Sequence, residues 1–217
     1  MVGGFMHKVA VLIPCYGSTD FLRPVIKQYL RLDKILVMNY LFIESEPFPD
    51  NTKDICKEFG IECVSGERLK QEDILNKGLE LLRDYQTVFL SDADEFIMRA
   101  DQDKMIERHT KSPDNFVTVP MIEYAGDLHH RYTERGHKPP VLCNPKARFY
   151  DVRCAEGCGS SYNDIYMHHL GFLANQEKIE WKRKKQVKTN RFDIVNELMS
   201  RLIEPYEPPQ ELLDLLR

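Results

Sequence analysis

The chain has 217 residues, 42% of them hydrophobic and 29% charged, and a formal net charge of −4. A chain of this length buries roughly 70% of the surface that it exposes when unfolded, so a single domain is stable without disulfides. The mildly acidic balance argues against nucleic acid as a partner. The apolar run at 9–13 is too short for a signal sequence or a membrane span, so we expect a cytoplasmic protein without a transmembrane segment, of bacterial or viral origin among the possibilities.

The cysteines could form disulfides, remain free thiols or bind zinc. With no export signal, we interpret the cysteines as reduced thiols. Cys154 and Cys158 have the spacing of half a zinc site, but the second close pair that a structural zinc module needs is missing.

The first part of the chain alternates between strand and helix patterns. Residues 8–14 are apolar without alternation, which predicts a strand buried on both faces. The apolar residues of 21–30 repeat at helical spacing and predict an amphipathic helix. Further strands are expected at 34–43, 61–64, 87–90 and 116–119, and further helices at 53–59 and 70–83.

This alternation predicts an α/β fold with a mostly parallel sheet and right-handed crossovers. Ligands bind such sheets beyond the carboxyl ends of the strands, which places Tyr16, Glu44 and Asp92 on one rim. After about residue 112 the regularity fades, and we expect an irregular second half within the same domain.

Two acidic residues, Asp92 and Asp94, follow the strand predicted at 87–90. In an extended segment, residues two apart point the same way, so both carboxylates can face one ligand. A divalent cation prefers such oxygen ligands and often completes its shell with phosphate oxygens. A solvated acidic turn is the plainer alternative, but the preceding strand favours the functional interpretation.

Three patterns follow one another along the chain: Ile13-Pro14-Cys15-Tyr16, Asn76-Lys77-Gly78 and Phe89-Leu90-Ser91-Asp92-Ala93-Asp94-Glu95-Phe96. In this order they resemble the signatures of family 2 glycosyltransferases. The form Asp-x-Asp-Glu-Phe is similar to one subgroup, whose later histidine-glycine-aromatic element is loosely matched by His168-His169-Leu170-Gly171-Phe172. The resemblance covers about residues 8–190.

The resemblance implies a GT-A (Rossmann-like) fold, with a mostly parallel sheet flanked by helices and an irregular acceptor-side half. It also implies a metal-dependent enzyme that moves a sugar from a nucleotide-sugar donor, with a UDP-sugar favoured, to an acceptor hydroxyl of a glycan or another molecule, with inversion. Within a single domain over 1–217, residues 1–100 would bind the nucleotide sugar. Residues 101–195 would bind the acceptor and complete the metal site, and 196–217 would form a tail.

For the donor, the resemblance implies a set of contacts around the base, the ribose and the diphosphate. Its members are Pro14 and Tyr16 at the base, Glu44 at the base or ribose, Asn76 in the pocket, Asp92 at the ribose, and Lys146 and Arg148 at the diphosphate. Each also has an ordinary alternative as a strand-end, solvated or surface residue. Gly17 replaces the family's usual asparagine, and the second strand ends in Glu44-Ser45-Glu46 instead of an aspartate-rich turn, so the nucleotide base stays open.

For the cation, the resemblance implies Mn²⁺ or Mg²⁺ on Asp94 and Asp92, with Glu95 orienting the loop. A late histidine, His169 or His168, would complete the metal shell. Neighbouring histidines on a strand face opposite ways, so we expect only one ligand, and the spacing to Gly171 favours His169. A buried, hydrogen-bonded histidine is the alternative.

An inverting transfer needs a carboxylate that deprotonates the acceptor hydroxyl. Glu123, Asp127 and Glu156 lie in the half expected to face the acceptor, and Asp127 is our choice.

Other functions remain open. A nucleotidyltransferase would need a glycine-rich basic loop after the first strand, whereas residues 15–20 are acidic and lack lysine. A non-catalytic module that binds nucleotide sugars or glycans fits the same fold. The basic run at 182–185 is interpreted as a solvated helix face or a membrane-surface contact, and no nucleic acid binding is expected. The sugar, the acceptor, the retaining or inverting course and the oligomeric state are left open.

Overall fold

The computed structural model describes residues 7–17, 20–43, 47–132, 138–151, 153–157, 159–171, 173 and 203–217. Glu44, Cys158 and the basic run at 182–185 lie outside the described residues. In the described part, the main sheet has the strand order β12-β6-β9-β4-β1-β2-β3. Its strands are β1 (Val9–Cys15), β2 (Lys34–Asn39), β3 (Glu62–Ser65), β4 (Thr87–Leu90), β6 (Phe116–Thr118), β9 (Pro140–Cys143) and β12 (Gly159–Ser161).

Most pairs in this sheet are parallel, which confirms the expected fold class. Strand β1 pairs in parallel with β2 and β4, and β2 with β3, while β12 pairs in parallel with β6. Strand β9 is antiparallel to both of its neighbours. The carboxyl ends of β1, β2 and β4 therefore lie along one edge of the sheet, where ligand sites of such folds form.

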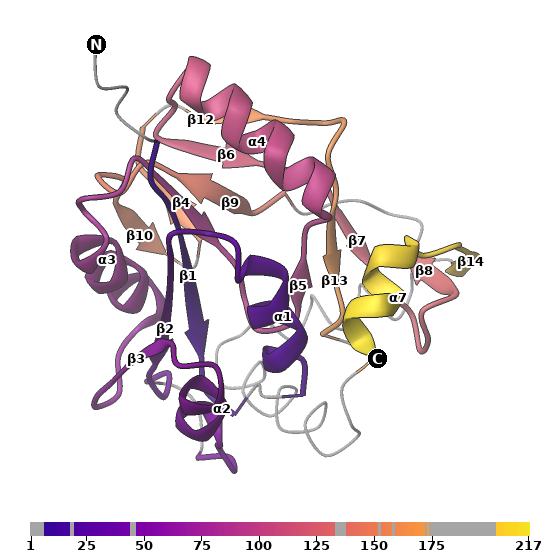
Figure 1. Cartoon of the computed structure of the whole chain (residues 1–217), viewed down its shortest axis with the longest axis horizontal. Coiled ribbons are helices and arrows are strands. Elements are labelled where there is room, and N and C mark those ends of the chain that lie inside the picture. The colour runs from indigo at the N-terminus through magenta and orange to yellow at the C-terminus, as the bar shows by residue number, and fades with distance from the viewer. Residues whose placement is uncertain are drawn as a thin grey trace.

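Each face of the sheet has its own apolar core, because successive side chains of a strand point to opposite faces. Val9, Val11 and Ile13 pack on the side of α1 (Leu22–Tyr29) and α2 (Thr52–Glu58). Ala10 and Leu12 pack on the other side with α3 (Gln71–Leu81). Figure 1 shows α3 on one side of β1 and α1 on the other. This two-sided burial explains why these strands lack polar alternation.

One helix, α4 (Arg99–Lys111), was not expected from the sequence. Few of its residues are apolar, and polar side chains anchor much of its buried face. Gln102 Nε2 donates to the carbonyl of Ile97 at 2.7 Å, and His109 Nδ1 lies 2.8 Å from Thr87 Oγ1. A hydrophobic period alone could not predict a helix held in this way.

Smaller sheets complete the second half of the chain. A three-stranded sheet has the order β5-β13-β7, with β5 (Glu95–Phe96) antiparallel and β7 (Met121–Glu123) parallel to the middle strand β13 (Met167–His169). Strands β10 (Phe149–Asp151) and β11 (Cys154–Ala155) form a hairpin. Strand β8 (His130–Tyr132) pairs with β14 (Ile203–Pro205).

The described part of the expected tail packs against the domain. Helix α7 (Gln210–Leu216) lies against α1, and Leu212 is fully buried in the core that α1 shares. The backbone N–H of Arg99 donates to the carboxylate of Glu211 at 3.0 Å. None of the described helices combines the length and apolar character needed to cross a membrane.

Candidate active site

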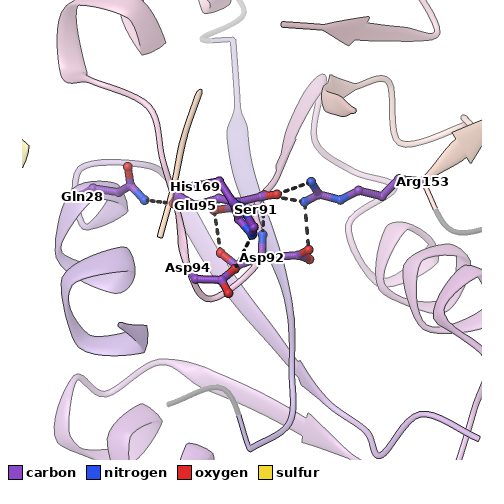
Figure 2. A network of polar contacts seen from close by, with 7 residues as sticks. All are labelled: Gln28, Ser91, Asp92, Asp94, Glu95, Arg153 and His169. Atoms are coloured by element: carbon purple, nitrogen blue, oxygen red, sulfur yellow. Dashed lines mark hydrogen bonds and ion pairs between the residues drawn. The ribbon is translucent and has the colours of Figure 1, made fainter. Parts of the chain in front are cut away.

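The acidic residues after β4 form a closed turn instead of the extended segment that we expected. The backbone N–H of Asp92 donates to Glu95 Oε2 at 2.8 Å, and the N–H of Glu95 donates to the carbonyl of Asp92 at 3.2 Å. Because these bonds bend the backbone, Asp92 and Asp94 do not share one direction. Figure 2 shows Asp92 directed toward Arg153 and Asp94 on the side of His169.

Asp94 and His169 form the pair that best suits a cation. His169 Nε2 lies 3.8 Å from Asp94 Oδ1, and the N–H of Leu170 donates to the Asp94 carbonyl at 2.9 Å. A Cβ atom at Gly171 would stand 2.6 Å from His169 Nε2 and 3.1 Å from Asp94 Oδ2. Glycine therefore leaves a space beside both groups that any other residue would fill.

A carboxylate and an imidazole are both ligands of Mn²⁺, and phosphate oxygens commonly complete such a shell. Within the described ranges, no group of three or more His, Cys, Asp or Glu side chains is arranged to hold a metal ion. Asp94 and His169 would supply two ligands of such a cation, and a bound diphosphate would supply others.

His168 faces away from this pair. Its Nδ1 lies 2.9 Å from the hydroxyl of Tyr124, and only 3% of the residue is exposed. The ring of Tyr206 lies edge-on to Tyr124, with the ring centroids 5.7 Å apart. Burial lowers the pKa of His168 to about 4. Its contacts are those of a buried, hydrogen-bonded histidine, which corrects its place among the candidate ligands.

Arg153 is a site residue that our sequence analysis did not find. Its two terminal nitrogens donate to the two carboxylate oxygens of Glu95 at 2.6 and 2.7 Å, and both side chains are almost fully buried. One of these nitrogens also lies 3.5 Å from Asp92 Oδ1. Burial by itself would lower the pKa of Arg153, but the carboxylates of Asp92 and Glu95 raise it above its ordinary value.

Asp92 has a mixed environment. Although 34% of its side chain is exposed, burial of the carboxyl within the site raises its pKa to about 6, and the positive charge of Arg153 limits that rise. The side chain of Glu95 accepts bonds from Arg153, and its carbonyl accepts a bond from Gln28 Nε2 at 2.9 Å. Glu95 thus orients the turn, the role expected for it.

The loop after β1 lies near the end of β2, where a nucleotide base was expected. The N–H of Gly17, whose φ is +61°, donates to Asp50 Oδ1 at 3.1 Å. Asn39 ends β2 and donates through Nδ2 to Asp50 Oδ2 at 2.9 Å, while its buried Oδ1 has no hydrogen-bond partner among the described residues. Asn39 and Asp50 were not among our candidates, yet the strand-end rule applied to β2 could have found Asn39.

Pro14 and Tyr16 border this loop. Pro14 is buried within β1 in register with Met38, and Tyr16 is half-buried just beyond the strand. Their contact with a base stays a prediction.

The side chain of Asn76 is bound to the backbone of Phe149. Its Nδ2 donates to the carbonyl of Phe149 at 2.8 Å, and its Oδ1 accepts the N–H of Phe149 at 2.9 Å. Both ends of the amide thus hold β10 against α3. Two residues later, Gly78 lies so close to Leu12 that a Cβ atom would overlap its side chain. The Asn-x-Gly pattern therefore has a packing role here.

The candidate bases occupy different surroundings. Glu123 is the register partner of His169 in the β7–β13 pair, so the two side chains lie on the same face of that sheet. Asp127 is exposed, and its carboxylate accepts bonds from the N–H of His129 and from His130 Nδ1. The side-chain bond to His130 lowers the pKa of Asp127.

The remaining candidates lie around the β10–β11 hairpin. The N–H of Glu156 donates to the carbonyl of Arg148 at 2.8 Å, and both residues are exposed. Lys146 is exposed in the turn before β10, where its N–H donates to Asn144 Oδ1 at 2.9 Å. Phosphate binding by Lys146 and Arg148 stays a prediction, as does a catalytic role for Glu156.

The parallel sheet, with a carboxylate–histidine pair at the carboxyl end of β4, defines a GT-A-type domain. The sequence profile of glycosyl transferase family 2 matches residues 10–171, so the chain belongs to this family of glycosyltransferases. The comparison with curated proteins found no match.

Solved structures share this fold at low sequence identity. S. aureus TarS 1-349 in complex with UDP-GlcNAc has a TM-score of 0.52 and 12% identity, covering 83% of this chain and 66% of that one. The glucosyl-3-phosphoglycerate synthase of Mycobacterium tuberculosis, in complex with Mn²⁺, UDP and phosphoglyceric acid, has a TM-score of 0.51 and 10% identity. That comparison covers 94% of this chain and 88% of the synthase. The chain spans 43% of the longer S. aureus TarS structure.

Proposed function

We propose that the chain is a metal-dependent glycosyltransferase that moves a sugar from a nucleotide-sugar donor, with a UDP-sugar favoured, to an acceptor hydroxyl with inversion. The observation that carries the proposal is the pair Asp94 and His169 beside Gly171, at the carboxyl end of β4. UDP-GlcNAc bound to TarS, and Mn²⁺ with UDP bound to the mycobacterial synthase, support this choice of donor and cation.

In this proposal, Asp94 and His169 hold Mn²⁺ or Mg²⁺. The cation, when bound, stabilises the negative charge of the diphosphate leaving group. Asp92 keeps part of its side chain exposed while one of its carboxylate oxygens lies 3.5 Å from Arg153, which suits a contact with the ribose. Because Gly171 has no side chain, the space between Asp94 and His169 stays open for the cation.

We assign recognition of the base to Asn39 in place of Glu44. Its Nδ2 is committed to Asp50, so its buried Oδ1 presents a hydrogen-bond acceptor at the end of β2. Uracil, thymine and guanine each carry a ring N–H that can donate to such an acceptor, whereas the cytosine ring has none. Because the exocyclic amino group of cytosine can also donate to this acceptor, the preference for a UDP-sugar over a CMP-sugar rests on the UDP-GlcNAc and UDP bound to the similar structures.

We assign the catalytic base to Glu123 in preference to Asp127. Glu123 shares a sheet face with His169, and this supports a role near the proposed cation. The carboxylate of Asp127 instead fixes its own turn through His129 and His130. A base must reach the acceptor hydroxyl near the anomeric carbon, so the residue beside the cation ligand is the better candidate.

The test is calorimetric binding of UDP, GDP, TDP and CMP, with Mn²⁺ or with EDTA. We expect UDP to bind more tightly with Mn²⁺, and Asp94→Asn and His169→Ala to lose that gain. The matched control is Asp84→Asn, an exposed carboxylate before β4 at the opposite end of the same strand, which should behave as wild type.

Two results would overturn the proposal. If UDP binds equally well in Mn²⁺ and in EDTA, and equally well to Asp94→Asn, the proposed metal site does not exist. A folded wild-type protein that binds none of the four nucleotides favours a glycan-binding module of the same fold.

A further inference from the structure

Arg153 has a backbone conformation that non-glycine residues rarely adopt. Its φ is +51°, and it lies in the connection between β10 and β11, where glycine or asparagine is the usual residue at such an angle. Residues held in this way persist only where their surroundings fix them, and they are common at functional sites. The contacts of the Arg153 side chain identify what fixes it.

The side chain binds two carboxylates of the acidic turn. Its fork donates to both oxygens of Glu95 at 2.6 and 2.7 Å and approaches Asp92 at 3.5 Å. An arginine makes this bidentate contact through its planar geometry, and a lysine cannot reproduce it. Arg153 therefore fixes the orientation of Glu95, as well as supplying charge (Figure 2).

Glu95 passes this constraint to the rest of the turn. Its second carboxylate oxygen accepts the N–H of Asp92 at 2.8 Å, which closes the turn that contains Asp94. The Asp94 carbonyl in turn accepts the N–H of Leu170, next to His169 on β13. A continuous set of contacts thus links Arg153 to the two groups that face each other at 3.8 Å.

The charges of the cluster agree with this arrangement. Asp92, Asp94 and Glu95 contribute three negative charges when ionised, and Arg153 contributes one positive charge. Two negative charges remain, which matches a divalent cation. Without Arg153, the buried Glu95 carboxylate would have no cationic partner among its described contacts and would be able to turn toward the cation itself.

We propose that Arg153 is a positioning residue of the transfer site: through Glu95 and Asp92 it holds the turn so that Asp94 and His169 are presented to the cation. This inference rests on the proposed function. It goes further by assigning metal-dependent donor binding to a residue that touches neither the donor nor the cation. Residues that orient metal ligands in this way typically change metal affinity by about 10- to 100-fold.

The experiment measures the Kd of UDP by calorimetry in Mn²⁺ and in EDTA, and uses the ratio of the two values as the readout. For Arg153→Met and Arg153→Lys, we expect the Kd in EDTA to stay within about twofold of wild type, because Asn39 and Asp50 hold the base side. The increase in UDP affinity that Mn²⁺ produces should fall by about tenfold or more in both variants. Glu95→Gln should reduce the gain in the same direction.

The matched control is Arg31→Met. Arg31 also bridges two side chains, with Nη1 to Asp103 and Nη2 to Gln102, but both partners belong to α4 and not to the acidic turn. Its loss should lower stability and leave the Mn²⁺ ratio unchanged. Circular dichroism identifies any variant that fails to fold, and Arg153→Lys serves where Arg153→Met does not fold.

The outcomes separate the two proposals. If wild-type protein shows no gain from Mn²⁺, the proposed function fails. If wild type shows the gain and folded Arg153→Lys and Arg153→Met both keep it, the positioning role of Arg153 is wrong. Parallel losses of UDP affinity in Mn²⁺ and in EDTA would show that Arg153 only maintains the fold, which also overturns the inference.

Discussion

Asn76 gives the sharpest test of whether the Asn-x-Gly pattern serves the fold or the donor. Its amide makes two hydrogen bonds to the backbone of Phe149, at 2.8 and 2.9 Å, and so joins α3 to β10. Replacing Asn76 with alanine removes both bonds without adding volume. We therefore expect lower stability with unchanged nucleotide binding.

The size of the loss follows from two opposing effects. Each hydrogen bond contributes about 1 kcal/mol net, and Phe149 loses a partner for both its N–H and its carbonyl. Alanine is the better helix former and returns roughly 0.5 kcal/mol inside α3. The net loss is about 1.5 kcal/mol, which for a domain of this size lowers Tm by roughly 3–6 °C.

The assay combines urea unfolding with UDP calorimetry on Asn76→Ala and on Glu80→Ala. Glu80 is exposed on the same helix, so its replacement controls for helix propensity and should change stability by about 0.5 kcal/mol or less. If Asn76→Ala were as stable as wild type but bound UDP at least tenfold more weakly, the amide would serve the donor. The packing account would then be refuted.

Two further predictions concern the base and the buried histidine. The rate is measured as UDP release from the UDP-sugar that binds best. Glu123→Gln should lower this rate by about 100-fold and leave the Kd of the donor unchanged, whereas Asp127→Asn should keep most of the rate. The reverse pattern would show that Asp127 is the base. His168 stays neutral in the folded protein down to about pH 4, whereas the unfolded chain takes up the proton near pH 6.5. Stability should therefore fall by up to about 3 kcal/mol as the pH drops from 7 toward 4, and urea unfolding of His168→Gln should show a smaller fall; equal slopes would contradict this.

The first half of the fold was predictable because its strands are apolar on both faces and its helices have one apolar side. Strand β1, for example, was expected at 8–14 and spans Val9–Cys15. Strand β2 was expected to continue to residue 43 but ends at Asn39, so Asn39 was not considered as a strand-end residue. Helix α4 was missed because polar contacts, and not an apolar stripe, hold much of its buried face.

The candidate site was predictable only in part. The resemblance brought Asp94 and His169 to attention although they are far apart in sequence, and the structure places them together. The direction of Asp92 was wrong because a bond from its N–H to Glu95 bends the segment. The sequence around Arg153 shows no motif and no hydrophobic periodicity. Its partners, Asp92 and Glu95, lie on another part of the chain, so the sequence did not indicate this contact.

The contact between α7 and α1 has a consequence for synthesis of the protein. Helix α1 is translated well before Leu212 of α7, which shares its core. Until then, part of the apolar face of α1 is uncovered and open to chaperones or to contacts between nascent chains. Completion of this side of the domain therefore waits until α7 has been made and has docked on α1.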